Sequence, residues 1–388
     1  MGLLRRLADH WDPPETRAHE PSWDALRGYS TAAGQQVNPH TAEGLSVVLA
    51  CVGAISGALA SLPAYVYRRQ GTARLEAPDH PLAGLIRRGP NRWQTWPDFT
   101  EWLAASALLR GNALVEIVTD RGVLVELRPI PWDNASVTML PSGRLAYDVS
   151  NIQSIYGGTG GMRRLLDTEV VHLRDRTDDG LVGRSRLHRA AAVVGAGLAV
   201  QNFASSLYQN GAFPSGTIEV PAALSDPALA QLRQRFSEAF TGPKNAAKAL
   251  VLENGVKWNS ISISPEDAEL LASRKFGGEE LARIFNVPPP LIGILDHSSF
   301  TNSETAGRWF AVHTLAPWIR KIEAEFGRAV LGGGAELEID MTGFLRGDPA
   351  QRWQSYDIAI RNKVLTVDEV REAEGYNPMP AGAGTPAE

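Results

Sequence analysis

The chain has 388 residues, of which 44% are hydrophobic and 21% charged, a composition typical of a soluble globular protein with room for two or three domains. Its net charge of −5 and pI near 6.0 argue against a protein that holds nucleic acid through a broadly basic surface, and leave transient DNA contact open. The single cysteine, Cys51, excludes an intramolecular disulfide and a cysteine-based zinc site, and its apolar neighbours predict a buried thiol.

The N-terminal third begins without a recognisable targeting signal. Residues 1–40 mix charges, prolines and aromatics without sustained periodicity, so we expect an arm that becomes ordered only against a partner or neighbour. Met1–Arg17 lacks the apolar core of a signal peptide. Residues 44–67 are uncharged and long enough to cross a bilayer, but their small side chains and Pro63 favour a buried soluble helix.

Residues 41–184 predict an α+β region, with helices first and a largely antiparallel sheet after them. Thr41 is expected to cap the apolar helix, which Pro63 ends, and Thr95 to cap a later helix with Pro97 in its first turn and Gly111 at its end. A short helix is predicted at 80–88. Period-two patterns predict strands at 64–68, 113–119, 123–128, 135–140, 145–149 and 169–174.

Two long helices are predicted to leave this region and return to it. Ser185–Gly211 is predicted to form one helix of about 26 residues, about 40 Å long, with a stripe of small and apolar side chains. Ser264 caps the returning helix, which runs to Asn286. Such a stripe needs neighbours, and identical copies in a ring would supply them. The insertion between the helices predicts strands at 216–220, 249–252 and 258–263 and a helix at 226–240.

A polar loop follows the returning helix. Val287–Pro290 must end that helix, because consecutive prolines remove N–H donors. Thr301–Glu304 is predicted to be a capping box that opens a further helix reaching Leu331, with a kink at Pro317. The last predicted elements are a strand at 337–341, helices at 348–362 and 366–375, and a disordered tail at 377–388.

Motifs for catalysis or cofactor binding are not found, so the sequence predicts neither a metal site nor a cofactor. Asp175–Arg186 imitates the start of a calcium loop, but Arg186 stands where a bidentate glutamate is required, which favours a surface turn. His297 lies beside Asp296 and Ser298, yet adjacent residues on a short loop do not hold triad geometry. Two other interpretations stay open: an enzyme with an unrecognised site, and a membrane channel built on 44–67 and 189–208.

Short motifs occur in a fixed order along residues 40–375. The motifs are His80-Pro81-Leu82, Pro90-Asn91, Phe99, Gly111-Asn112-Ala113, Val171-His172-Leu173-Arg174, Asp179–Ser185, Asn210–Gly216, Ala282–Pro289, Leu291-Ile292-Gly293 and Thr314-Leu315-Ala316-Pro317. In this order and spacing they resemble the portal proteins of long-tailed bacteriophages and of phage-derived gene transfer agents, and the order and spacing make the resemblance specific.

The resemblance implies the portal fold, an α+β structure with wing, two-helix stem, small α/β clip, tunnel loop with kinked helix, and short helical crown. The implied divisions follow the predicted elements. They are an arm at 1–40, wing at 41–184 and 303–345, stem helices at 185–211 and 264–287, clip at 212–263, tunnel loop at 288–302, crown at 346–376 and a tail at 377–388. The brief C-terminal region implies no tall crown barrel.

The resemblance also implies a structural role and not an enzymatic one. Its family forms a ring, usually of twelve subunits, at one capsid vertex, assembled in the host cytoplasm and kept in the virion. Double-stranded DNA passes through the ring without sequence-specific contact; the implied protein partners are the terminase large subunit, the head–tail adaptor and the major capsid protein, with no membrane. We expect the tunnel loop to face DNA through His297, Ser298, Ser299, Phe300, Thr301 and Asn302. The clip is expected to dock its partners through Lys244, Asn245 and Lys248.

Overall fold

The computed structural model describes residues 28–71, 73–150, 161–209, 216–219, 257–260, 270–295, 300–332, 334–342, 349–377 and 379, with the helical positions 227, 230, 231 and 234. The chain divides into two compact units, residues 1–339 and 340–388.

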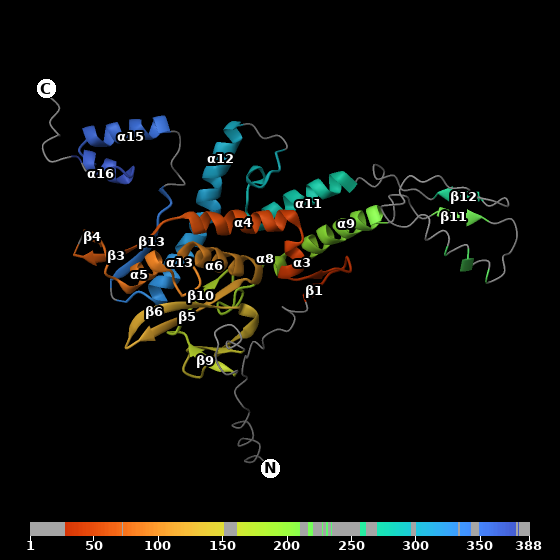
Figure 1. Ribbon diagram of the computed structural model, residues 1–388, viewed down its shortest axis with the longest axis horizontal. Coiled ribbons are helices and arrows are strands. Elements are labelled where there is room, and N and C mark those ends of the chain that lie inside the picture. Colours follow the sequence, from red (N-terminus) through yellow and green to blue (C-terminus); the bar gives the residue numbers. More distant parts are fainter. Residues whose placement is uncertain are drawn as a thin grey trace, which may run out of the picture. The chain divides into compact units, whose positions relative to one another are not determined.

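Two helices form the centre of the first unit. α4 (Ser46–Ser61) packs against α6 (Trp96–Arg110), as Figure 1 shows. α6 begins as the sequence predicts: the Asp98 N–H donates to the Thr95 hydroxyl, and the Thr95 N–H donates to the Asp98 carboxylate (3.1 Å). Gly111 ends the helix with a left-handed φ of 79°.

The apolar helix begins later than predicted. Thr41 does not cap it; this residue lies in the short helix α3 (Pro39–Glu43), whose cap is Asn38. α4 then buries Cys51 completely, and burial raises the pKa of its thiol to about 12. Within the described residues, none of the helices combines the length and the apolar character that crossing a bilayer requires.

A sheet joins distant parts of the first unit in the order β13-β3-β4. β3 (Ala64–Gln70) is the predicted strand, and β4 (Ala73–Glu76) was not predicted. β13 (Ala335–Ile339) pairs antiparallel with β3, with Leu337 opposite Val66, and both side chains are buried. Because α13 (Ala316–Ala329) packs on β13 and on β10, the late segment completes the core of the early one.

Residues 112–174 form two small antiparallel sheets and not the one sheet that we expected. β10 (Val170–Arg174), β5 (Asn112–Asp120) and β6 (Val123–Ile130) make the first. β7 (Ala135–Met139), β8 (Leu145–Val149) and β9 (Arg163–Leu166) make the second, and β9 was not predicted. The two sheets share a core that includes Leu114, Ile130 and Tyr147.

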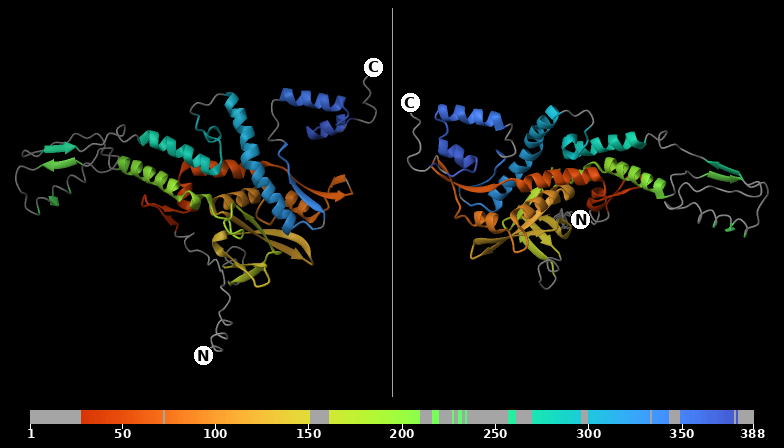
Figure 2. Two further views of the ribbon diagram at one scale, coloured as in Figure 1. Left: turned by 180° about the vertical axis from the view of Figure 1, so that it is seen from behind. Right: turned by 45° about the horizontal axis from the view of Figure 1, so that its top comes forward.

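The predicted long helices lie side by side in two views (Figures 1 and 2). The first is interrupted: α8 (Arg186–Arg189) and α9 (Ala191–Gln209) are separated at Ala190, with φ −111° and ψ 25°. At this break the Arg189 guanidinium donates to the Asp178 carboxylate (2.6 Å) and to the Arg176 carbonyl (3.0 Å), so the end of α8 is tied to the preceding loop. The second, α11, is described over Leu270–Phe285; its predicted start at Ser264 lies outside the described residues.

Two predicted strands of the insertion between these helices are present. β11 (Gly216–Glu219) pairs antiparallel with β12 (Lys257–Ser260). The predicted strand at 249–252 lies outside the described residues.

The N-terminal prediction was wrong for the last residues of the arm. β1 (Tyr29–Ser30) and β2 (Gln36–Val37) form a hairpin against α9. Tyr29 stacks on His188 with ring centroids 3.6 Å apart, and the Asn202 amide donates to Gln35 (2.8 Å). The sequence pattern hides this hairpin because each strand has two residues, too few to show a period.

After η3 (Pro289–Ile292) the described chain resumes in α12 (Phe300–Phe310). The predicted capping box at Thr301–Glu304 is therefore wrong, because this segment is already helical. α12 continues through a π-helical segment, η4 (Ala311–Leu315), into α13.

The second unit holds α15 (Pro349–Arg361) and α16 (Val367–Ala373). The predicted cap of α16 is confirmed, since the Thr366 N–H donates to Glu369 (2.7 Å) and the Glu369 N–H donates to the Thr366 hydroxyl (3.2 Å).

Candidate functional site

Most of the predicted contact residues lie outside the described part of the chain. This holds for His297, Ser298 and Ser299 of the loop, and for the insertion residues Lys244, Asn245 and Lys248. Phe300, Thr301 and Asn302 form the first turn of α12, and only their backbone is described. The structure does describe residues at both ends of the loop, and it shows the contacts that hold the helices flanking it.

Arg186 ties the end of α11 to the start of the outgoing helix. Its guanidinium donates to the carbonyls of Phe285 (2.8 Å) and Ile284 (3.4 Å), which belong to the last turn of the helix, where carbonyls lack partners in the helix itself. The same group pairs with Asp175 (3.0 Å), and both side chains are largely buried. A cation at the negative end of a helix is favourable, so Arg186 fixes where α11 ends and the loop begins.

Asn286 locks the end of α11 to the π-helical segment. It has a left-handed φ of 60°, a conformation that asparagine tolerates better than most residues. Pro317 has no N–H, so it cannot donate to the carbonyl of His313 four residues earlier. The Asn286 side-chain amide donates to that carbonyl instead (2.9 Å), and the Thr314 hydroxyl donates to the Asn286 carbonyl. We call these contacts the Asn286 latch.

The latch bears on the predicted kink. Pro317 stands in the first turn of α13, directly after η4. The π-helical hydrogen bond from the Ala316 N–H reaches back to the Ala311 carbonyl. The segment therefore continues as helix beyond Pro317 while its hydrogen-bond ladder changes register, a local irregularity with an identifiable cause.

A second junction holds the outgoing helix to the first sheet. The Asn112 side-chain amide and the Gly183 peptide form a reciprocal pair: Nδ2 donates to the Gly183 carbonyl (2.7 Å), and the Gly183 N–H donates to Oδ1 (2.8 Å). A side chain at Gly183 would place its Cβ 2.0 Å from the carbonyl oxygen of Gly111. Only glycine fits there, which gives a physical reason for the Gly111-Asn112 motif and for Gly183 in the Asp179–Ser185 motif.

His172 completes this junction as a buried neutral imidazole. Its Nδ1 accepts from Arg174 Nε (3.2 Å) and lies 3.1 Å from the Tyr147 hydroxyl. Since Arg174 can only donate, the ring proton is on Nε2, which donates to Asn112 Oδ1 (3.0 Å). Burial first, and then the charges of Arg174 and Arg328, hold the pKa of His172 well below its usual value. This geometry gives His172 a structural role.

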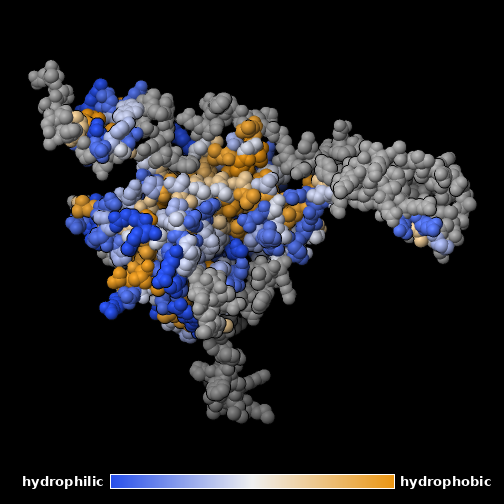
Figure 3. Space-filling view, viewed as in Figure 1, coloured by the Kyte–Doolittle hydropathy of each residue, from blue (hydrophilic) through white to orange (hydrophobic). Residues whose placement is uncertain are grey.

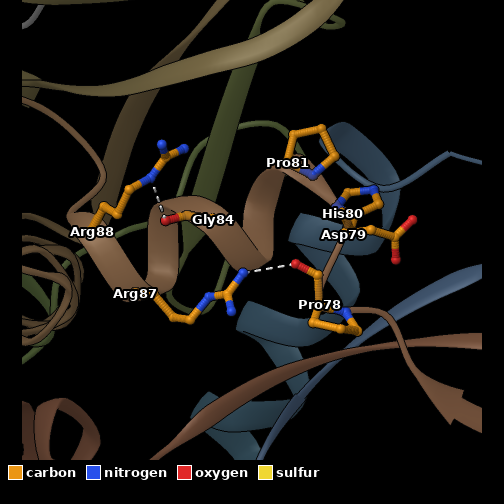
Figure 4. A pocket seen from close by; sticks show the side chains of 7 residues that line it. All are labelled: Pro78, Asp79, His80, Pro81, Gly84, Arg87 and Arg88. Carbon is orange, nitrogen blue, oxygen red and sulfur yellow. Dashed lines mark hydrogen bonds between the residues drawn. The ribbon is translucent and has the colours of Figure 1, made fainter.

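A groove of about 490 Å³ lies beside α5 (Pro81–Arg88), shown in Figure 4. His80 caps this helix through Nδ1, which accepts from the Leu82 N–H (3.2 Å). Figure 4 shows Arg87 turned toward the Pro78 carbonyl (2.8 Å) and Arg88 toward the Gly84 carbonyl (3.3 Å). These polar groups already have structural partners, so the side chains that line the groove stabilise a turn and do not form a catalytic site.

The segment that imitates a calcium loop is a turn stabilised by its own side chains. Both the Leu181 and the Val182 N–H groups donate to Asp179 Oδ1, and Asp175 is paired with Arg186. Across the described ranges there is no cluster of three or more histidine, cysteine, aspartate or glutamate side chains placed to hold a metal ion.

Sequence reasoning missed Asn286, Arg186 and Asn112 as functional supports. Asn286 carried one signal: it directly precedes Val287 and the prolines, at the place where a left-handed residue commonly ends a helix. Asn112 belongs to the Gly111-Asn112-Ala113 motif, which does not reveal its contacts, and Arg186 carried no signal, because each has partners far away in the sequence.

Comparison with known proteins identifies the class to which this arrangement belongs. The family model described as phage portal protein matches residues 46–375. The probable portal protein of Streptomyces phage phiC31 is 30% identical over 96% of this chain and 84% of its own length. The portal protein of Enterobacteria phage HK97 is 29% identical over 87% of this chain and 80% of its own length.

A solved structure agrees with these relatives. One chain in the neck of a native gene transfer agent particle, computed with C12 symmetry, is 25% identical and has a TM-score of 0.55. The match covers 87% of this chain and 91% of that one. The protein therefore belongs to the phage portal family, and the resemblance, the mixed α+β fold and the structural role predicted from its motifs are confirmed. The family consists of structural portal proteins, so the enzyme interpretation is rejected.

Proposed function

We propose that twelve copies of this chain form a ring at one vertex of a capsid, around a channel through which double-stranded DNA enters and leaves. The observation that carries the proposal is membership of the portal family across residues 46–375, together with a neighbour in a particle neck of C12 symmetry. The ring would be assembled in the host cytoplasm and retained in the virion or gene transfer agent particle.

In this ring, residues 41–184 and 303–345 serve as the wing, and the pairing of β13 with β3 supports one shared core. The stem is formed by 185–211 and 264–287, whose described parts pack as α9 against α11. Residues 212–263 act as the clip, 288–302 as the tunnel loop and 346–376 as the crown.

The tunnel loop contacts DNA through His297, Ser298, Ser299, Phe300, Thr301 and Asn302. Small polar groups touch phosphates without reading bases, so the duplex can slide. The ends of the loop support this role, because the Arg186 contacts and the Asn286 latch fix both flanking helices. The net charge of −5 on each copy further disfavours tight retention of DNA.

The loop hypothesis is tested by deleting residues 296–301 and, separately, by replacing them with a Gly-Ser segment of equal length. Both changes are expected to alter the length of packaged DNA and its retention in the particle. The replacement separates the loop side chains from loop length. Particles with unchanged DNA length and retention in both variants would contradict the role.

Partner docking is assigned to Lys244, Asn245 and Lys248 on the clip, first for the terminase large subunit and later for the head–tail adaptor. The major capsid protein surrounds the wing. Reversing both lysine charges to glutamate is expected to impair motor and adaptor binding while the ring still assembles. Lys363→Glu, an exposed site in the second unit, is the matched control. Normal binding of the motor and the adaptor to the double variant would show that the interface lies elsewhere on the chain.

A further inference from the structure

Four elements that pack on one another each expose a large apolar side chain. α4 contacts α11, η3 and η4, and α12 contacts η3. The exposed fractions are 56% for Leu49 on α4, 57% for Phe276 on α11, 51% for Val312 on η4 and 41% for Trp309 on α12. Figure 3 shows hydrophobic residues gathered over α4 and beside it. We call Leu49, Phe276, Trp309 and Val312 the apolar face.

These side chains lie outside the core because the helical segments that carry them bury their opposite sides. Phe310 and Leu315 of the same helical stretch are buried at 3% and 0% exposure, so its inner side is already filled. Trp309 and Val312 lie three residues apart and therefore share the opposite side. Several large apolar side chains exposed on elements that pack on one another indicate an interaction site.

The chemistry of the face selects its partner. α4 has no charged residue in its 16 positions, and η3 is Pro289–Ile292, also without charge. The four side chains of the face carry no charge and offer a phosphate only the Trp309 indole N–H, while the exposed Arg308 and His313 stand next to Trp309 and Val312 in the chain. Large apolar side chains with polar residues beside them fit another protein surface better than a phosphate backbone, because protein interfaces combine an apolar core with a polar rim.

We infer that the apolar face is the contact that each copy makes with the next copy in the ring. The inference rests on the proposed ring and adds the surface that closes it. A ring of identical subunits needs a head-to-tail contact between two different faces, and the C12 symmetry of the structural neighbour requires such a contact. The face belongs to the elements that the Asn286 latch and Arg186 hold together, so ring closure and loop position are set by the same elements.

Cysteine labelling tests the inference with a closely matched pair. Val312 and Val123 are both valines, exposed at 51% and 52% in the single chain; Val123 lies on the β5–β6 hairpin, away from the face. Cys51 is fully buried with a pKa raised to about 12, so it reacts slowly and leaves a quiet background. Val312→Cys and Val123→Cys are each labelled with a maleimide in ring and monomer fractions separated by size exclusion.

The two variants should label at similar rates in the monomer. In the ring, the labelling rate of Val312→Cys should fall to about one tenth of its rate in the monomer or lower, because interface cores are packed like protein interiors. Val123→Cys should keep its rate. Val312→Asp should reduce ring yield strongly, whereas Val123→Asp should not.

The outcomes separate this inference from the proposed function. Rings in which Val312→Cys labels as fast as in the monomer would contradict the face while leaving the ring intact. Slow labelling of Val312→Cys already in the monomer would show that residues of the same chain cover this position, and would also contradict the inference. A chain that forms no ring would contradict the proposed function and this contact together.

Discussion

The Asn286 latch makes a prediction that depends on one missing N–H group. Asn286→Gly keeps the left-handed backbone without strain, since glycine adopts a φ of 60° freely, and removes only the side chain. The lost hydrogen bond to the His313 carbonyl is worth about 1 kcal/mol. That energy corresponds to roughly fivefold faster exchange of the amide hydrogens that the latch protects, in the last turn of α11 and at 311–316.

The same substitution should cost less when Pro317 is replaced. Pro317→Ala restores an N–H that can donate to the His313 carbonyl, so the Asn286 amide is no longer its only donor. In this background Asn286→Gly is expected to change exchange by about twofold or less, a coupling between the two sites of roughly 0.5 to 1 kcal/mol.

Hydrogen–deuterium exchange read by mass spectrometry on peptides covering 280–320 measures both effects. Arg121→Gly is the control, because Arg121 also has a left-handed φ (49°) but lies in the β5–β6 turn, so exchange at 311–316 should not change. Equal acceleration by Asn286→Gly in the unmodified chain and in the Pro317→Ala variant would refute the reasoning.

Three further results are expected. The folded state holds His172 neutral with a depressed pKa, so the unfolded state binds the proton first, and this residue should lower stability by up to about 1.4 kcal/mol per pH unit below about pH 6.5. Urea unfolding from pH 7 to 5 should show the slope, and His172→Gln should reduce it, leaving the part due to His80 and His188, whose pKa values are also lowered. An unchanged slope in His172→Gln would contradict the reasoning. Gly183→Ala should cost about 3 kcal/mol or more because of the clash with the Gly111 carbonyl. Gly327→Ala in the last turn of α13, where a Cβ meets no other atom, should stabilise by about 0.5 to 1 kcal/mol. A tolerated Gly183→Ala would show that the junction relaxes. Cys51 should resist maleimide at pH 8 until urea unfolds the chain, and rapid labelling of the native protein would contradict its burial.

Local signals in the sequence predicted those elements whose ends are set by nearby residues. The helix after Thr95 and the helix after Thr366 were placed correctly, because each capping box has both partners within three residues. The same rule failed at Thr301, where a Thr-Asn-Ser-Glu pattern occurs inside a helix. A capping pattern permits a helix start, and only the preceding backbone decides whether the start is used.

Long-range contacts could not be predicted from these patterns. The pairing of β13 with β3 joins strands at Ala335–Ile339 and Ala64–Gln70, and nothing in the later strand specifies its partner. The break at Ala190 coincides with contacts to Asp178 and Arg176, which act from a loop before the helix. For the site, the order of helix, loop and helix was predictable, whereas Asn286, Arg186 and Asn112 became meaningful only when their partners were known.

Electron microscopy of the purified protein tests the central claim most directly. The account predicts ring-shaped particles with twelve-fold symmetry and a central opening wide enough for a DNA duplex. Particles that remain single subunits, or that assemble without a central opening, would contradict it.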